Sequence, residues 1–201
     1  MNDRSGIFSG ENPLKIAKTW LEKASRTETS DHNAVTLATV DEGGLPNARI
    51  VLLKDISYDE FIFYTNYNSA KSKELITNGK AALVIHWKSL KRQIRVRGLV
   101  KKENGKIADL YFSSRPSESR IGAWTSKQSQ PLESRKLLLE EFEKNKSKRD
   151  LENKRPDFWG GFKLRPLEIE FWSEGDFRLH DRFKWFRAGL QDDWVVSRLY
   201  P

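Results

Sequence analysis

The chain has 201 residues, of which 37% are hydrophobic and 32% are charged, and its formal net charge is +8. This length suits one sizeable domain or two small ones, and the composition is typical of a soluble globular protein. The sequence has no cysteine, which excludes disulfides and thiolate metal sites, and no apolar run approaches membrane length.

Charge and histidine spacing narrow the possible partners. The three histidines, His32, His86 and His180, are too widely spaced for a metal-ligand pattern, so no metal is expected. The polar N-terminus lacks the apolar segment of a secretory leader, so we expect a cytoplasmic protein without a membrane partner. The positive charge suggests an anionic partner, which could be nucleic acid, an acidic surface or a phosphorylated small molecule.

The first part of the chain predicts a helix followed by a β-hairpin. Residues 1–11 carry little apolar content and are expected to be mobile. Pro13 marks the start of a helix, because proline suits the first helical position. Residues 34–40 and 48–54 are strand-like, and the turn-forming stretch 41–46 between them predicts a β-hairpin.

The middle of the chain predicts a barrel. We expect a third strand over 60–65, a short helix over 69–78 that Gly79 ends, and further strands over 81–87 and 93–100. Five β segments thus fall within about seventy residues with mostly short connections, which favours a closed antiparallel barrel over a parallel sheet.

The second half of the chain predicts helices first and strands last. We expect helices over 107–112, 118–124 and 131–148, and strands over 167–172, 177–185 and 194–199. The aromatic, glycine-rich residues 158–162 are typical of close backbone packing at a turn. The fold class is therefore mainly β with α, with an N-terminal segment and helix over 1–33 and a single domain over 34–201.

Arg178, His180 and Arg182 alternate along one of the last predicted strands. If the backbone is extended there, all three side chains leave the same face and concentrate positive charge on a small surface. A bound anion would offset this crowding, and a solvated basic strand is the simpler alternative.

Five short stretches in predicted strands or turns also carry polar side chains that the secondary structure alone does not require. These stretches are 49–54, 64–66, 69–71, 92–93 and 128–129. Lys71 falls in the first turn of a predicted helix, where a helix N-terminus and an adjacent cation suit a phosphate. Together the stretches offer many donors and few carboxylates, which suits a phosphorylated ligand, although each could also be a solvated strand end.

Several motifs in combination resemble the FMN-dependent pyridoxine/pyridoxamine 5'-phosphate oxidase family. The matching stretches are AVTLATVDEGGLPNARIVLLK, FIFYTNYNSAKSKEL, RQIRVRG, YFSSRPSESRIGAWTSKQSQPLESR, FWGGFKLRPLEIEFW and RLHDR. They run from Ala34 to the C-terminal residues and cover most of the chain.

The resemblance implies a fold, a cofactor and a set of site residues. The implied fold is a split β-barrel homodimer with two FMN sites at the subunit interface, each built from both chains. The positions assigned to FMN are Arg49, Ile50, Val51, Leu52, Leu53, Lys54, Tyr64, Thr65, Lys71, Gln93, Gln128, Ser129, Trp172 and Arg182. The positions assigned to the substrate are Lys54, Tyr111, Arg115, Ser119, Arg178 and His180, and the last two are the catalytic candidates.

The implied reaction is the oxidation of pyridoxamine 5'-phosphate and pyridoxine 5'-phosphate to pyridoxal 5'-phosphate, with dioxygen as acceptor and hydrogen peroxide as product. One alternative is a split-barrel FMN oxidoreductase that acts on another substrate, and the intact set of substrate positions argues against it. The other alternative is a basic nucleic-acid module, which predicts a basic stripe with exposed aromatic residues. Here the excess of positive charge is instead partly located in the stretch from Lys144 to Lys154, so we expect no nucleic-acid partner.

Two departures from the family pattern bear on the site. The family usually has arginine or another long polar residue at the position of Ala70, so one contact to the FMN phosphate is expected to be missing. Lys71, the Ser69 hydroxyl and Arg49 are the candidates to replace that contact. The segment that covers the substrate in some relatives has no match in residues 1–11, and no site residue is assigned there.

Overall fold

The computed structural model describes residues 4–57, 59–148 and 154–201. Its strands are β1 (Ala34–Val40), β2 (Pro46–Ser57), β3 (Glu60–Asn66), β4 (Lys80–Trp87), β5 (Arg92–Glu103), β6 (Trp159–Ser173), β7 (Asp181–Phe186) and β8 (Val195–Leu199). Its helices are η1 (Gly6–Phe8), α1 (Pro13–Thr27), α2 (Ala70–Asn78), α3 (Lys106–Ser114), α4 (Ser117–Thr125), α5 (Arg135–Lys146) and η2 (Asp176–Arg178).

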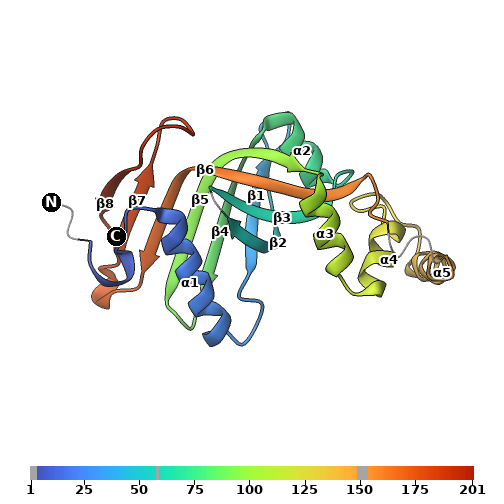
Figure 1. The fold of residues 1–201 in the computed structure, drawn as a ribbon, viewed down its shortest axis with the longest axis horizontal. Coiled ribbons are helices and arrows are strands. Elements are labelled where there is room, and N and C mark those ends of the chain that lie inside the picture. The colour runs from blue at the N-terminus through green and yellow to red at the C-terminus, as the bar shows by residue number, and fades with distance from the viewer. Residues whose placement is uncertain (1–3, 58, 149–153) are drawn as a thin grey trace.

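The strands form one antiparallel sheet that closes on itself. Their order is β3-β2-β1-β4-β5-β6-β7-β8, and β3 also pairs with β6, which makes a barrel of the first six in this order. Strands β7 and β8 extend the sheet beyond the barrel at one end of the molecule, whereas α3, α4 and α5 gather at the other end (Figure 1). The predicted antiparallel barrel is confirmed.

Strand β6 links the two ends of the molecule. Its first part pairs with β3, from Trp159 opposite Asn66 to Leu164 opposite Phe61. Its last part pairs with β7, from Glu168 opposite Phe186 onward. Because the strand is shared in this way, residues at its two ends belong to different regions of the protein.

The N-terminal segment packs against the core, contrary to the expected mobility of residues 1–11, of which 1–3 lie outside the described residues. Phe8 is 5% exposed, and its ring centroid lies 4.9 Å from that of Phe183 and 5.7 Å from that of Trp20. Helix α1 begins as expected, because the Asn12 side chain accepts hydrogen bonds from the backbone N–H of Leu14 at 2.9 Å and of Lys15 at 3.2 Å. Burial of aromatic rings therefore orders a segment of low apolar content.

The structure corrects two other expectations about local structure. Close packing around the glycines of residues 158–162 is confirmed, but only Phe158 lies in a turn, since β6 begins at Trp159 and runs through both glycines. The strand expected from residue 177 begins only at Asp181, because Phe177 and Arg178 adopt positive φ angles of 56° and 64° within η2. Arg178 and His180 therefore lie before β7, and the three side chains of Arg178, His180 and Arg182 do not share one strand face.

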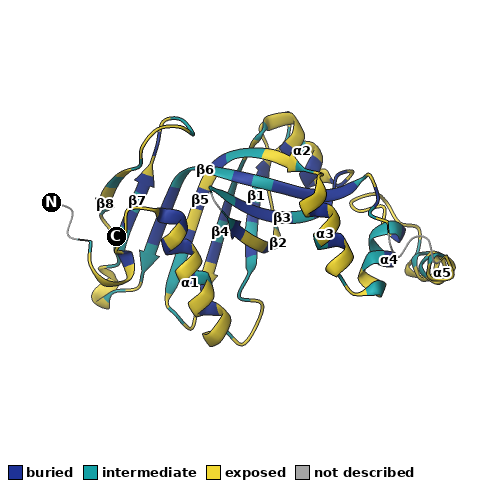
Figure 2. Cartoon of the chain, in the orientation of Figure 1, coloured by how far each residue is buried: buried dark blue, intermediate teal, exposed yellow. Residues whose placement is uncertain are grey.

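Helix α5 is shorter than the expected 131–148. None of its residues is buried, and Figure 2 shows it largely exposed beside α4. Within the described part of the chain, no helix is both long and apolar enough to cross a membrane.

At the bulge between β5 and β6, the structure predicts that residue 98 must be glycine. A Cβ on Gly98 would lie 2.1 Å from the backbone oxygen of Arg165, which cannot move without disturbing the barrel. We expect Gly98→Ala to lower the free energy of unfolding by about 3 kcal/mol. Gly122→Ala is the control: the added Cβ would meet no atom within 4 Å, and alanine favours the helix by about 1 kcal/mol. Equal destabilisation of both variants in thermal unfolding would contradict this prediction.

Candidate functional site

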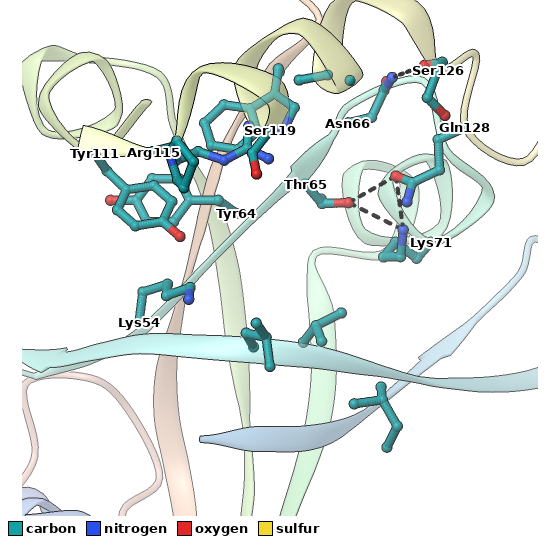
Figure 3. A pocket seen from close by; sticks show the side chains of 17 residues that line it. Lys54, Tyr64, Thr65, Asn66, Lys71, Tyr111, Arg115, Ser119, Ser126 and Gln128 are labelled. Carbon is teal, nitrogen blue, oxygen red and sulfur yellow. Dashed lines mark hydrogen bonds between the residues drawn. The ribbon is translucent and has the colours of Figure 1, made fainter. Parts of the chain in front are cut away.

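A cleft of about 600 Å³ lies between strands β2 and β3 and the helices α2, α3 and α4. Many of the site residues predicted from the sequence line this cleft, and they come from segments that are far apart in the chain. Those residues are Ile50, Val51, Leu52, Lys54, Tyr64, Thr65, Lys71, Tyr111, Arg115, Ser119 and Gln128. Figure 3 shows two groups of polar side chains here, one around Lys71 and one around Arg115.

The first group surrounds a buried ammonium. Lys71 is 8% exposed, and its Nζ donates to Oγ1 of Thr65 at 3.1 Å, to Oγ of Ser69 at 3.1 Å and to Oε1 of Gln128 at 3.3 Å. All three partners are neutral oxygens. Burial, and after it the charge of Arg49, lowers the pKa of Lys71 to about 8. A desolvated cation with neutral partners suits an anion that enters the cleft.

Arg49 lies outside this lining and has its own carboxylate. Its Nη2 is 3.2 Å from Oε2 of Glu74, and its Nη1 donates to the Leu37 carbonyl at 3.2 Å and to the Thr39 hydroxyl. Burial alone would raise the pKa of Glu74, but hydrogen bonds from Thr39, Asn47 and Arg49 hold it below its usual value. Arg49 therefore ties α2 to the barrel.

The departure at residue 70 faces away from this cleft. Ala70 is exposed and lines a different surface pocket, together with the acidic residues Asp41, Glu42 and Glu74. Of the three candidates to replace its contact, Lys71 alone lines the cleft. The Ser69 hydroxyl donates to the Asn66 carbonyl at 2.7 Å, and Arg49 is engaged by Glu74.

The second group centres on the guanidinium of Arg115, at the bend between α3 and α4. Its Nη1 is buried and finds no hydrogen-bond partner among the residues that the structure describes. Burial lowers the pKa of Arg115. The backbone of the bend is fixed by Arg120, whose Nη1 donates to the carbonyls of Arg115 at 2.6 Å and Ser113 at 2.9 Å. With Tyr111 and Ser119 on the same cleft, the group offers a fork and two hydroxyls to an anion.

Two stacked aromatic rings also line the cleft. The rings of Tyr64 and Tyr111 stack with centroids 4.0 Å apart and an interplanar angle of 19°. Nζ of Lys54 lies 5.7 Å from the centroid of the Tyr111 ring. Burial raises the pKa of Tyr64 to about 12, so its hydroxyl remains protonated and can donate a hydrogen bond at neutral pH.

A second set of predicted residues lies on β6 and its neighbours, outside the cleft lining. Gln93 of β5 and Arg182 of β7 flank Trp172 on opposite sides. The ring centroids of Trp172 and His180 are 4.7 Å apart, and Nδ1 of His180 accepts from the Gly175 backbone N–H at 3.3 Å. Arg178 is exposed in η2.

Arg182 is held by strong polar contacts. Its Nε and Nη2 donate to Oε1 of Glu170 at 3.0 and 2.8 Å, and its Nη1 donates to the Tyr200 carbonyl at 2.9 Å.

Two further predicted residues do not line the cleft. Leu53 is 1% exposed in the barrel core, and Ser129 has a positive φ of 71° in the loop after α4.

The structure adds cleft residues that the sequence did not single out as site residues. They are Asn66, Pro116, Gly122, Ala123, Ser126 and Trp159. Asn66 donates through Nδ2 to the Ser126 carbonyl at 3.2 Å and so fixes the loop that carries Gln128. The sequence indicates only close packing around Trp159, whereas the pairing of β6 with β3 places it on the cleft lining.

Comparison with family models finds two matches. Residues 21–148 match the family described as pyridoxamine 5'-phosphate oxidase. Residues 159–201 match the family described as pyridoxine 5'-phosphate oxidase C-terminal dimerisation region. The first match contains the cleft except for Trp159, and the second contains the set on β6 and β7.

Several known proteins are similar over the whole chain. A protein of Roseobacter denitrificans named pyridoxine/pyridoxamine 5'-phosphate oxidase is 57% identical over 201 residues, which is 100% of both chains. A protein of Bartonella quintana with the same name is 51% identical and covers 95% of this chain and 93% of its own length.

Two solved structures share the fold. PhzG from Burkholderia lata, in complex with tetrahydrophenazine-1-carboxylic acid, has a TM-score of 0.85 and 27% identity, covering 96% of this chain and 94% of its own. A pyridoxamine 5'-phosphate oxidase-related, FMN binding protein from Nostoc punctiforme has a TM-score of 0.77 and 16% identity, covering 96% and 100%. At that lower identity the likeness concerns the fold alone.

The lowered pKa of Lys71 predicts how anion binding depends on pH. An anion needs the charged ammonium, so binding of a simple phosphate monoester, dianionic above pH about 6, should weaken as pH rises through about 8. Calorimetric titration should show this loss in the protein but not in Lys71→Met, which should bind weakly at every pH. The same alkaline loss in both proteins would exclude Lys71 as its source.

The same pKa predicts a stability change in the unliganded protein. Because the pKa of Lys71 falls from 10.5 to about 8 on folding, the unfolded chain binds more protons between these values. The contribution of Lys71 to the free energy of unfolding therefore increases as pH rises from 8 to 10.5. Comparison with Lys71→Met in chemical denaturation should isolate this increase, and a parallel pH dependence in the two proteins would contradict it.

Proposed function

The chain belongs to the pyridoxamine 5'-phosphate oxidase family, and we propose that it catalyses the FMN-dependent oxidation of pyridoxamine 5'-phosphate and pyridoxine 5'-phosphate to pyridoxal 5'-phosphate. The observation that carries this proposal is one cleft with two desolvated cationic groups, Lys71 and Arg115. Two separate anions in one cleft suit a phosphorylated cofactor beside a phosphorylated substrate.

The group around Lys71 fits the phosphate of FMN. A phosphate there would give the buried ammonium an anionic partner and could also accept from the Thr65 hydroxyl. The neighbouring strand β2 offers the apolar side chains of Ile50 and Leu52, which are 62% and 39% exposed, to a flat ring system. When bound, FMN supplies the two-electron acceptor of the reaction.

The group around Arg115 fits the substrate phosphate. Its Nη1 is a buried donor without a partner in the described part of the chain, and Tyr111 and Ser119 line the same cleft. Lys54 lies below the ring of Tyr111 in Figure 3, on the cleft lining, where it can contact the substrate. Holding both phosphates fixes the distance between the reacting carbon and the cofactor, which is how binding energy is converted into rate.

Dioxygen is the proposed final acceptor. Oxidation of the alcohol then converts pyridoxine phosphate and O2 into the aldehyde and H2O2. Oxidation of the amine consumes one water in addition and releases ammonia. The cations around the cleft stabilise negative charge that develops during the transfer, and the protonated Tyr64 hydroxyl is a donor for such charge.

We further propose that each site is completed by a second copy of the chain in a homodimer. Trp159 and Trp172 are thirteen residues apart on one strand, which separates them by roughly 40 Å if the strand is extended. The set around Trp172 and His180 therefore cannot reach the cleft that Trp159 lines within one chain. Phe177 is 93% exposed and Leu179 69% exposed, as expected for a segment that packs against a partner. The match of residues 159–201 to a dimerisation region supports this assembly.

Within the homodimer, we assign Arg178 and His180 to the substrate and Trp172 and Arg182 to FMN. Gln93 and Ser129 are assigned to FMN with them, as are the β2 residues from Arg49 to Lys54. Arg49 and Leu53 would act through the backbone or by holding neighbouring elements, because their side chains do not line the cleft.

An alternative substrate class is represented by the PhzG structure, whose ligand is a tricyclic carboxylic acid. That protein is 27% identical to this chain, compared with 57% for the relative named as a pyridoxine/pyridoxamine 5'-phosphate oxidase. The bound ligand of PhzG carries no phosphate. A guanidinium fork binds a carboxylate as well as a phosphate, so it is the higher identity to the named oxidase that favours the phosphorylated substrate.

Anaerobic mixing tests the proposed activity. We expect the protein to purify yellow as a dimer, and its flavin absorbance to bleach when pyridoxamine 5'-phosphate is added without oxygen and to return when oxygen is admitted. Unphosphorylated pyridoxamine is the control and should bleach the flavin far more slowly. A colourless protein, or a flavin that pyridoxamine 5'-phosphate leaves oxidised, would refute the proposal.

The two arginines near His180 are predicted to have different roles. Arg178→Ala removes an exposed side chain assigned to the substrate, so turnover should fall at least tenfold with little loss of bound FMN. Arg182→Ala removes contacts to Glu170 and Tyr200 and should mainly weaken FMN retention. Flavin content after dialysis and steady-state turnover measure the two effects. Equal flavin loss in both variants would contradict this division.

A further inference from the structure

We propose that Trp159 is a positioning residue that makes the site selective for phosphorylated substrates, because its indole ring holds the guanidinium of Arg115. This inference rests on the proposed function, in which Arg115 receives the substrate phosphate. Trp159 itself lines the cleft and is 6% exposed.

The guanidinium of Arg115 makes a cation–π contact with the indole ring of Trp159. The guanidinium carbon lies 4.7 Å from the centroid of the Trp159 ring and 5.6 Å from that of Phe112. A tryptophan face attracts a cation most strongly where water is excluded. The Arg115 carbonyl is fixed separately by Arg120, so the ring contact acts on the side chain. The ring thus holds the fork in place while its Nη1 remains available for an anion.

The indole ring is fixed by other rings around it. It lies nearly parallel to Tyr64, at an interplanar angle of 7° with centroids 5.6 Å apart, and to Tyr111, at 12° and 6.1 Å. Phe112 meets it edge-on at 5.1 Å. Because three rings surround it, the indole cannot tilt without disturbing Tyr111, which lies on the same helix α3 as Phe112.

The backbone of Trp159 is anchored to the same helix. Its carbonyl accepts from Nη1 of Arg155 at 2.5 Å, and Nε of Arg155 pairs with Asp109 of α3 at 2.7 Å. Arg155 therefore connects the first residue of β6 to the helix that carries Tyr111. Both the backbone and the ring of Trp159 are therefore held in place by contacts that lead to α3.

The two glycines that follow Trp159 allow this close arrangement. A Cβ on Gly160 would lie 2.1 Å from the Tyr67 hydroxyl oxygen, and a Cβ on Gly161 would lie 3.0 Å from the Tyr64 ring. Residues with side chains would push β6 away from β3 and carry the indole with it. The glycine pair thus serves the position of Trp159, and through it that of Arg115.

The test compares binding of pyridoxal 5'-phosphate and pyridoxal to the FMN-loaded protein. The ratio of the two affinities measures phosphate selectivity. We expect Trp159→Leu to reduce this ratio about tenfold, and Trp159→Phe, which keeps an aromatic face, to restore most of it. Trp124→Leu is the matched control. Trp124 lies in α4, stacks edge-on with Phe158 at 5.7 Å and donates to the Lys154 carbonyl, and it does not line the cleft.

A double-mutant cycle separates positioning through Arg115 from a general structural effect. In Arg115→Met the fork is already lost, so adding Trp159→Leu should change the ratio by less than twofold. A full tenfold loss in that background, or an unchanged ratio in Trp159→Leu alone, would overturn the inference. FMN content and thermal unfolding identify a variant that fails to fold, in which case Trp159→Met, which keeps apolar bulk but has no aromatic face, replaces Trp159→Leu in the cycle with Arg115→Met. If the wild-type protein itself does not prefer pyridoxal 5'-phosphate, the proposed function fails instead.

Discussion

The pairing of β6 with three other strands is the constraint on which the rest of the structure depends. Pairing with β3 closes the barrel, pairing with β5 runs along its side, and pairing with β7 extends the sheet beyond it. The same strand therefore begins at the cleft with Trp159 and ends beside His180 with Trp172. Because β6 is one continuous extended strand that does not fold back on itself, the two groups of site residues are held far apart within one chain. This separation is the physical reason to infer that a second copy completes each site.

The charge of the protein is organised differently on the barrel surface and in the cleft. On the β5–β6–β7 face the arginines meet carboxylates, as Arg95 and Arg182 do at Glu170. In the cleft, Lys71 has neutral hydrogen-bond partners and Arg115 lies over aromatic faces. Glu170 is only 6% exposed, so its ion pairs with Arg95 and Arg182 offset the cost of burying its carboxylate. The desolvated cations in the cleft are costly until an anion arrives, which is why they mark a ligand site more clearly than net charge does.

The aromatic residues connect barrel closure to the site. Tyr64 of β3, Tyr111 of α3 and Trp159 of β6 come from three distant parts of the chain and lie close to parallel. Their contact requires the close approach of β6 to β3 that Gly160 and Gly161 permit. Packing of the core and orientation of the polar groups are therefore one arrangement, so a change made in the barrel wall can be felt at the Arg115 fork.

The sequence by itself determined the helix start at Asn12, the β segments of the barrel and, through motif resemblance, most of the cleft residues. The helix start depends on local capping and the strands on short-range alternation. The cleft residues belong to sequence motifs that can be recognised without knowing which residues are in contact. The tertiary structure alone decided that Trp159 faces the cleft, that Arg49 pairs with Glu74 and that the chain leaves the extended conformation at Phe177 and Arg178. Each of these depends on a partner distant in sequence or on backbone angles that the residue type does not specify. From the sequence alone, Gly160 and Gly161 predict a turn. Only the rings of Tyr64 and Tyr67 packed against them show why glycines are needed within a strand.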